Sequence, residues 1–186
     1  MTRRHIALIG FSTTGKSTVA QRLAARLGWS ALDTDQVIVA TAGQPIHALF
    51  KREGEAAFRQ REAAALQAAL AGERKVIATG GGIVTLPDNR AALADSAYRV
   101  WLTARPETVV ARLRQAAPSE PRPLLDAPDP LVRIQELLAR REALYREADL
   151  VVETDERTPD EVTQIILDWF QPVSSASVGL TGAGGE

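Results

Sequence analysis

The chain has 186 residues, of which 45% are hydrophobic and 24% are charged, and its formal net charge is -1. A chain of this length and composition can bury one good hydrophobic core, and its balanced charge excludes a bulk attraction to nucleic acid or to acidic membranes. It contains no cysteine and two histidines, which excludes disulfides and cysteine-ligated metals and leaves oxygen atoms as the metal ligands. Because no signal-peptide core or membrane-spanning apolar segment is found in the sequence, we expect a cytoplasmic protein without membrane or nucleic-acid partners.

The first predicted strand, residues 6–9, runs directly into a glycine-rich sequence that is typical of a P-loop. The form G-x-x-x-x-G-K-S is present as Gly10-Phe11-Ser12-Thr13-Thr14-Gly15-Lys16-Ser17, and apolar residues follow it at helical spacing. Such a loop folds around an anion, and the N–H groups at the start of the next helix bind phosphate. Lys16 is expected to reach the β- and γ-phosphates of a nucleotide, and the Ser17 hydroxyl to ligate Mg²⁺. The alternative, a glycine-rich turn with a solvated lysine, is disfavoured by both flanks.

Two aspartates, Asp33 and Asp35, follow the second predicted strand. In an extended chain their side chains point the same way, toward the crevice shared with the P-loop. One carboxylate would hold the metal through water, and the other would position or deprotonate an acceptor hydroxyl. The alternative is that Asp35 caps the next helix and Asp33 closes a turn. An acid is missing at the end of the third strand, which favours Asp33 as the metal carboxylate.

The next part of the chain predicts a short helix at 46–50, a longer helix at 55–70 and a third strand. Arg59 lies beside the apolar stripe of the longer helix, and taken alone it favours an ion pair with Glu55 or Glu62. The third strand runs into Gly80-Gly81-Gly82. These glycines indicate either a loose turn or bare N–H groups that a small ligand can approach closely.

A fourth strand at 98–102 and a helix from Pro106 lead into a proline-rich segment. Five prolines between residues 117 and 130 exclude regular structure there and predict a mobile surface loop. Arg122 in this loop is a candidate lid arginine that meets the transferring phosphoryl group when the loop closes. The alternative is an ordinary exposed arginine.

The rest of the chain predicts a long helix at 131–146, a fifth strand and a last helix. Arg141 shares a face of the long helix with apolar residues, so it either reaches solvent or binds an anion. The last helix starts at a capping box, Thr158-Pro159-Asp160-Glu161. Residues 174–186 are rich in serine and glycine and have little to bury, so we expect a disordered tail.

Alternating strands and helices predict the α/β class, with a doubly wound, five-stranded parallel sheet and helices on both faces. Ligands bind outside the carboxyl ends of the strands of such sheets, where the P-loop, the aspartates and the glycine triplet all lie. We therefore expect one domain over residues 1–173, with a mobile lid at about 115–130, and a tail after it.

In this order the motifs resemble shikimate kinase, a member of the nucleoside-monophosphate-kinase-like P-loop group. The resemblance runs from Ile6 to about Trp169, and it includes Gly54-Glu55-x-x-Phe58-Arg59-x-x-Glu62, Arg122-Pro123-Leu124-Leu125 and Arg141-x-x-Leu144-Tyr145. It implies a P-loop kinase fold and the ATP-dependent phosphorylation of the 3-hydroxyl of shikimate, a step toward aromatic amino acids. It also implies a monomer.

The resemblance implies residue roles as well. The shikimate-binding residues would be Asp35, which contacts hydroxyls and serves as base, Gly81 and Gly82, which donate N–H groups, and Arg59 and Arg141, which clamp the carboxylate. Ser17 and Asp33 would hold Mg²⁺. With Asp35, the catalytic residues would be Lys16 and Arg122. The residues implied to bind ATP are Gly10, Ser12, Thr13, Thr14, Gly15, Lys16, Ser17, Thr18, Arg122 and Pro159, the last of which lies against the adenine.

Three positions depart from the family pattern. Thr13 stands where a third P-loop glycine is usual, and a β-branched residue resists positive φ, so we expect either a different path of that peptide or weaker nucleotide binding. Val39 replaces a common acid, and Ala143 a common proline. Two other functions stay open: a gluconate-type kinase, and a nucleotide-binding regulatory protein that has lost turnover.

Overall fold

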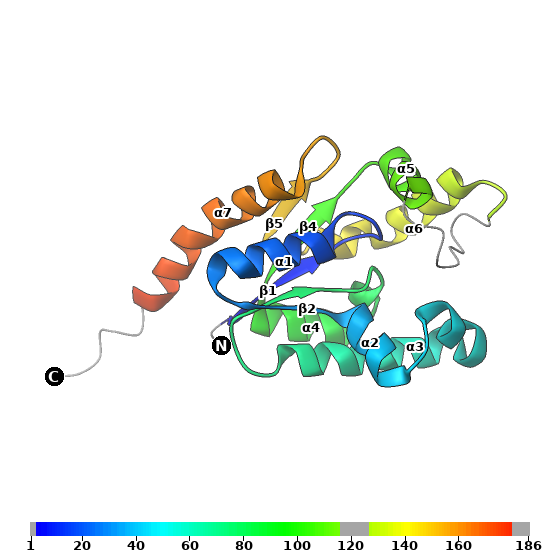
Figure 1. The fold of residues 1–186 in the computed structure, drawn as a ribbon, viewed down its shortest axis with the longest axis horizontal. Helices are drawn as coiled ribbons and strands as arrows, with labels where there is room; N and C mark the ends of the chain where they lie inside the picture. The colour runs from blue at the N-terminus through cyan, green and yellow to red at the C-terminus, as the bar shows by residue number, and fades with distance from the viewer. Residues whose placement is uncertain (1–2, 116–126, 180–186) are drawn as a thin grey trace.

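The computed structural model describes residues 3–115 and 127–179, with side chains described only as far as Gln171 at its C-terminal end. In this part of the chain five parallel strands form one sheet in the order β2-β3-β1-β4-β5, which confirms the predicted α/β class (Figure 1). The strands are β1 (His5–Ile9), β2 (Ser30–Asp33), β3 (Lys75–Ala78), β4 (Ala97–Thr103) and β5 (Leu150–Glu153). The helices are α1 (Lys16–Leu27), α2 (Thr34–Ala42), α3 (Ile46–Leu70), α4 (Pro87–Ser96), α5 (Pro106–Gln115), α6 (Pro130–Tyr145) and α7 (Pro159–Gly179), with a 3₁₀ turn η1 (Ile83–Thr85).

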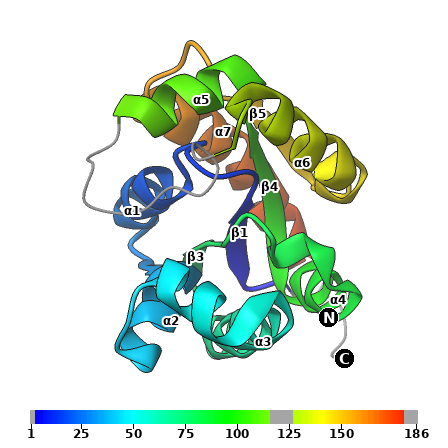
Figure 2. The same cartoon turned by 90° about the vertical axis from the view of Figure 1, so that its right-hand side faces the viewer.

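Helices cover both faces of the sheet, as Figures 1 and 2 show. Strand β1 at its centre is buried along its whole length, so apolar side chains point to both sides. Ile6 and Leu8 join the apolar cluster that includes residues of α1 and α7. Ala7 and Ile9 join the cluster on the other face, which includes residues of α3, α4 and α6. The two cores hold β1 rigidly, and the loop that follows β1 therefore starts from a fixed point.

Two predicted helix boundaries are explained by backbone conformation and capping. The two helices predicted between residues 46 and 70 are the two arms of α3, and Gly54 between them has φ 79° and ψ 176°, which a residue with a Cβ rarely adopts. At the start of α7, Thr158 N donates to Glu161 Oε2 at 2.7 Å and Glu161 N donates to Thr158 Oγ1 at 3.3 Å. This reciprocal pair confirms the predicted capping box.

The tail was predicted to begin at residue 174, but helix α7 extends to Gly179. The serines at 174, 175 and 177 do not end the helix, and Gly179 is the first glycine in it. Residues 180–186 lie outside the described residues, as do residues 116–126, which include Arg122 and most of the predicted lid. None of the described helices is both long and apolar enough to cross a membrane.

His5 lies at the start of β1, at the opposite end of the strand from the P-loop. Its side chain is buried, and its Nε2 lies 3.1 Å from the carbonyl oxygen of Leu70. Burial is the main cause that lowers the pKa of His5, and the charges of Lys75 and Arg4 lower it further, whereas the hydrogen bond to Leu70 raises it. The folded chain therefore takes up a proton at His5 only at lower pH than the unfolded chain does.

This difference predicts a loss of stability in mild acid. The stability contributed by neutral His5 is complete above about pH 6.5 and is lost as the pH falls below it, by at most ~1.4 kcal/mol per pH unit. His5→Gln keeps a donor for Leu70 but cannot titrate, so its free energy of unfolding should fall less than that of the wild type between about pH 7.5 and about pH 5.5. Urea unfolding at several pH values measures this, with His47→Gln as control. An equal pH dependence in wild type and His5→Gln would contradict the prediction.

Candidate active site

Three of the predicted motifs follow three adjacent strands. The P-loop follows β1, Asp33 ends β2, and the Gly80–Gly82 triplet follows β3, and these strands are neighbours in the order β2-β3-β1. Because the strands are parallel, their carboxyl ends meet at one edge of the sheet. The fold therefore brings the three motifs together as predicted.

The P-loop is held tightly against the sheet. Gly10 has φ 138°, and a Cβ there would lie 2.2 Å from the carbonyl oxygen of Leu102 in β4, so only glycine fits. The buried Lys16 ammonium donates to the carbonyl oxygens of Gly10 at 2.9 Å and Phe11 at 2.5 Å. Burial lowers the pKa of Lys16 to about 8, although the charges of the Asp35 and Asp33 carboxylates raise it. Ser12, Ser17 and Thr18 are more exposed, and the Thr14 hydroxyl donates to Phe11 O at 3.0 Å.

Thr13 adopts the conformation that its β-branched side chain resists. Its φ is 61°, in the left-handed region, and its buried hydroxyl has no hydrogen-bond partner among the described residues. Arg112 of α5 donates to the Thr13 carbonyl oxygen at 3.3 Å. The positive φ that a glycine would supply here is thus kept by threonine, at a strain cost on the order of 1–3 kcal/mol.

The two carboxylate oxygens of Asp33 accept hydrogen bonds from different parts of the site. Oδ1 caps α2, accepting from Asp35 N at 2.9 Å and from Gln36 N at 3.3 Å. Oδ2 accepts from the Ser17 hydroxyl of the P-loop at 2.5 Å. Asp33 is therefore the helix cap, and the alternative that gave this role to Asp35 is wrong. The argument from an extended chain is also wrong, because Asp35 lies in the first turn of α2.

Asp35 lies in an acidic and largely buried environment. Burial is the largest cause that raises its pKa to about 6, and the carboxylates of Asp33 and Glu62 raise it as well, while Lys16 and Arg59 lower it. Near neutral pH it remains mostly a carboxylate, with its proton affinity increased. An oxygen of this kind accepts a hydrogen bond strongly and can take a proton from a hydroxyl.

The glycine triplet is not a loose turn, because charged side chains lie directly against it. A Cβ on Gly82 would lie 2.0 Å from Nη1 of Arg59, and a Cβ on Gly80 would lie 2.6 Å from Oε1 of Glu62 and 2.8 Å from Oδ1 of Asp35. Gly81 packs against the P-loop instead, where a Cβ would lie 3.4 Å from Gly10 O. A side chain at Gly80 or Gly82 would therefore have to displace the charged ends of side chains from α2 and α3 that lie against the backbone.

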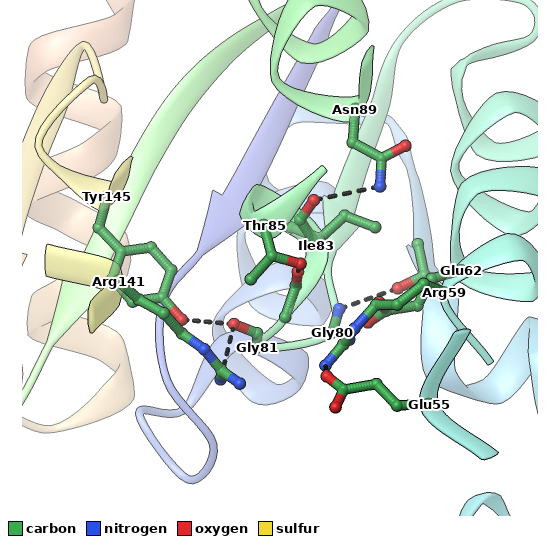
Figure 3. Close-up of polar contacts among 12 residues, drawn as sticks. Glu55, Arg59, Glu62, Gly80, Gly81, Ile83, Thr85, Asn89, Arg141 and Tyr145 are labelled. Atoms are coloured by element: carbon green, nitrogen blue, oxygen red, sulfur yellow. Dashed lines mark hydrogen bonds and ion pairs between the residues drawn. The ribbon is translucent and has the colours of Figure 1, made fainter. Parts of the chain in front are cut away.

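Arg59 and Arg141 lie on opposite sides of this loop, and Figure 3 shows them there. Arg59 is only 14% exposed and forms the predicted ion pairs, with the buried Glu62 and with the 71% exposed Glu55. Arg141 donates to Gly81 O at 3.3 Å, and its guanidinium lies 5.8 Å from the centre of the Phe11 ring. Arg59 approaches the loop from α3, and Arg141 approaches it from α6.

Sequence reasoning missed several polar residues that hold this site together. Thr34 is fully buried and accepts from Gly80 N at 3.0 Å. Arg112 joins the P-loop to the segment after β5, where it donates to Thr154 Oγ1 at 2.9 Å. Tyr145 of α6 donates to Gly81 O at 2.5 Å. No local spacing pattern could have found these contacts, because their partners are distant in the sequence.

Two residues predicted to bind the nucleotide, Pro159 and Arg122, do not belong to the P-loop. Pro159 begins α7, two residues before Glu161, which lines a hollow of ≈ 680 Å³ between the segments that follow β4 and β5. Arg122 lies outside the described residues. Among the described residues no three His, Cys, Asp or Glu side chains cluster as a metal site.

Comparison with known proteins identifies the family. A model of the shikimate kinase family matches residues 12–171. A shikimate kinase of Symbiobacterium thermophilum is 42% identical over 168 residues, which cover 90% of this chain and 96% of that protein. The structure titled as shikimate kinase from Acinetobacter baumannii in complex with shikimate is 35% identical and superposes with a TM-score of 0.83, covering 91% of this chain and 93% of that one.

A more distant similarity bears on the gluconate-type alternative. A gluconokinase from Sinorhizobium meliloti is 16% identical over 88% of this chain and 90% of that one, with a TM-score of 0.55. That likeness concerns the fold alone, whereas the shikimate kinase matches concern the sequence along nearly the whole chain. The chain therefore belongs to the shikimate kinase family of ATP-dependent small-molecule kinases.

Proposed function

We propose that this protein transfers the γ-phosphoryl group of ATP to the 3-hydroxyl of shikimate, which yields shikimate 3-phosphate and ADP. The observation that carries the proposal is the direct packing of a phosphate-binding loop against a second loop flanked by two arginines. Gly81 lies against Gly10 and Ser12 of the P-loop, so a donor and an acceptor bound at the two loops would meet. A bidentate pairing of guanidinium with carboxylate suits an acidic acceptor.

At the nucleotide end, the residues Gly10 to Thr18 would bind the phosphates, and Pro159 would lie against the adenine. Lys16 would exchange the carbonyl oxygens of Gly10 and Phe11 for phosphate oxygens. The Ser17 hydroxyl and the Asp33 carboxylate, 2.5 Å apart, are oxygen donors that suit Mg²⁺, which binds few protein groups and completes its shell with phosphates and water. When bound, Mg²⁺ would neutralise charge on the β- and γ-phosphates.

At the acceptor end, Asp35 would accept a hydrogen bond from the reacting hydroxyl and take its proton. The N–H groups of Gly81 and Gly82 would donate to the acceptor. Arg141 and Arg59 would bind its carboxylate, and Arg59 could do so by giving up its pair with Glu55, which is exposed and therefore weak. Catalysis would come from positioning and charge stabilisation, with Arg122 of the lid reaching the transferring group.

Three further statements stay predictions from the sequence. They are a single catalytic domain over 1–173 with a lid at 115–130, a monomeric state and a cytoplasmic location. A regulatory protein without turnover is the remaining alternative, and the retained Lys16, Asp33 and Asp35 give it no support.

The proposed reaction is tested by ADP release from MgATP with shikimate, quinate, gluconate or no acceptor. We expect turnover with shikimate, no more than background without acceptor, and none in Lys16→Ala, which loses the phosphate contact. Turnover only with another acceptor would replace the substrate, and bound ATP without turnover on any acceptor would support the regulatory alternative.

Arg141→Ala should raise the KM for shikimate by roughly 10- to 100-fold, because it removes a charged hydrogen-bond donor for the carboxylate. The affinity for ATP should be unchanged. Arg140→Ala is the matched control, because Arg140 is the neighbouring arginine on α6 and its side chain is exposed. Steady-state kinetics and ATP titration measure both effects. An unchanged KM for shikimate in Arg141→Ala would contradict the proposed role of Arg141 in binding the carboxylate.

Thr13→Gly should stabilise the fold by about 1 kcal/mol, because it removes a strained φ and a buried hydroxyl without a partner. The P-loop already follows the left-handed path at this residue, so the affinity for ATP should change by no more than about twofold. Urea unfolding and ATP titration check the two statements, with Ala25→Gly at an exposed position of α1 as a control for the effect of an added glycine. A gain in ATP affinity without a gain in stability would show that threonine distorts the loop.

A further inference from the structure

The carbonyl oxygens of the loop from Gly80 to Val84 are held one by one within the protein. The oxygen of Gly80 accepts from Ile83 N at 3.1 Å, and that of Gly82 accepts from the Thr85 hydroxyl at 2.7 Å. The same pattern continues along η1, where Asn89 Nδ2 donates to Ile83 O at 3.1 Å and Arg90 donates to Val84 O at 2.8 Å. These partners all lie within η1 and α4, close in the sequence to the oxygens they hold.

Gly81 is the exception, because its carbonyl oxygen is held from α6. Tyr145 donates to it at 2.5 Å and Arg141 donates at 3.3 Å. The N–H groups of Gly81 and Gly82 have no hydrogen-bond partner among the described residues. With its carbonyl oxygens held, the loop therefore presents two free N–H donors, and the orientation of the peptide between them depends on the bond from Tyr145.

Tyr145 is suited to hold a position. Its side chain is 0% exposed, and its ring stacks on Trp101 of β4 with 5.6 Å between centroids and 22° between planes. Burial raises the pKa of Tyr145 to about 12, so its hydroxyl keeps its proton and stays a donor. Trp101 lies on the strand paired with β1, so the hydroxyl is fixed to the same sheet that carries the P-loop.

Arg141 and Tyr145 share one acceptor but differ in what they are free to do. The contact of Arg141 with Gly81 O is the longer, and its guanidinium also faces the space proposed for the substrate carboxylate. If Arg141 turns to that carboxylate, Tyr145 alone holds the Gly81 peptide. Gly81 faces the P-loop, where an added Cβ would lie 3.4 Å from Gly10 O and 3.5 Å from Ser12 N, so a shift of the Gly81 peptide would change the spacing between the acceptor loop and the phosphate loop.

We propose that Tyr145 is a positioning residue for phosphoryl transfer, whose hydroxyl fixes the Gly81 peptide so that the acceptor stays aligned with the phosphate loop while Arg141 binds the acceptor. The proposal rests on the proposed function of the same site. It separates two roles on α6: Arg141 supplies affinity for the acceptor, and Tyr145 supplies alignment.

The test is Tyr145→Phe, which keeps the stacked ring and removes only the hydroxyl. The proposal expects kcat with saturating shikimate to fall by tenfold or more, since small misplacements of reacting groups cost up to about 10²-fold. The dissociation constant for ATP should stay within about twofold of the wild type, because the P-loop is untouched. Tyr98→Phe is the matched control, because Tyr98 lies near the opposite end of β4, against Trp169 and Phe170.

The readouts separate alignment from folding. Rates are expressed per ATP-binding site, counted by titration, at a temperature where circular dichroism shows the variant folded. A normal kcat per site in Tyr145→Phe would overturn the proposal even if the variant melts earlier. If Tyr145→Phe does not fold, Tyr145→Met replaces it, since methionine can fill the buried site without a hydroxyl; a normal kcat per site there would also overturn the proposal. A wild type that turns over no acceptor would instead reject the proposed function, and the positioning role with it.

Discussion

The site depends on a stretch of backbone that has no room for side chains. At Gly80 and Gly82 the position of a Cβ is already taken by charged groups from α2 and α3. This close approach lets the Arg59–Glu62 pair lie buried beside Asp35, where an uncompensated charge would cost several kcal/mol. The lack of side chains at Gly80 and Gly82, the buried ion pair and the raised pKa of Asp35 thus belong to one packing arrangement. A Cβ at Gly80 or Gly82 would displace the charged side chains and so disturb both the ion pair and the environment of Asp35.

The polar groups of the site bind one another. Lys16 donates to the carbonyls of its own loop, Ser17 to Asp33, and Arg141 to Gly81 O. A ligand bound here would take over some of these donors and acceptors, and leaving the buried Lys16 without a partner would cost more than the net gain of a typical hydrogen bond. Binding therefore exchanges bonds instead of adding them, and the affinity for each ligand is a difference between two sets of contacts.

Local patterns in the sequence predicted the local features well. The strand before the P-loop, the arms of α3 around Gly54 and the capping box at Thr158 follow from residues within a few positions of each other. The prediction that Asp33 and Asp35 lie in an extended chain, with side chains pointing the same way, was wrong, because helix α2 begins between them. The contacts from Thr34 to Gly80, from Arg112 to Thr13 and from Tyr145 to Gly81 could not be predicted, because each joins residues separated by dozens of positions that meet only after the sheet has formed.

The P-loop is restrained on two sides, and the two restraints differ in kind. On one side lies Gly81, where an added Cβ would come within 3.4 Å of Gly10 O; its carbonyl oxygen is held by Tyr145 of α6, whose ring stacks on Trp101 of β4. On the other side Arg112 donates to the carbonyl of Thr13, a residue whose φ already lies in the left-handed region. A strained peptide persists only where its surroundings hold it, and Arg112 is one such restraint. Since Arg112 also bonds Thr154 after β5, a movement of that segment would change the support of Thr13, whereas the contact at Gly81 would stay with the sheet. The P-loop is therefore tied to the segment after β5 through the hydrogen bonds of a single side chain, whereas on the Gly81 side its neighbour is held by a ring packed on the sheet.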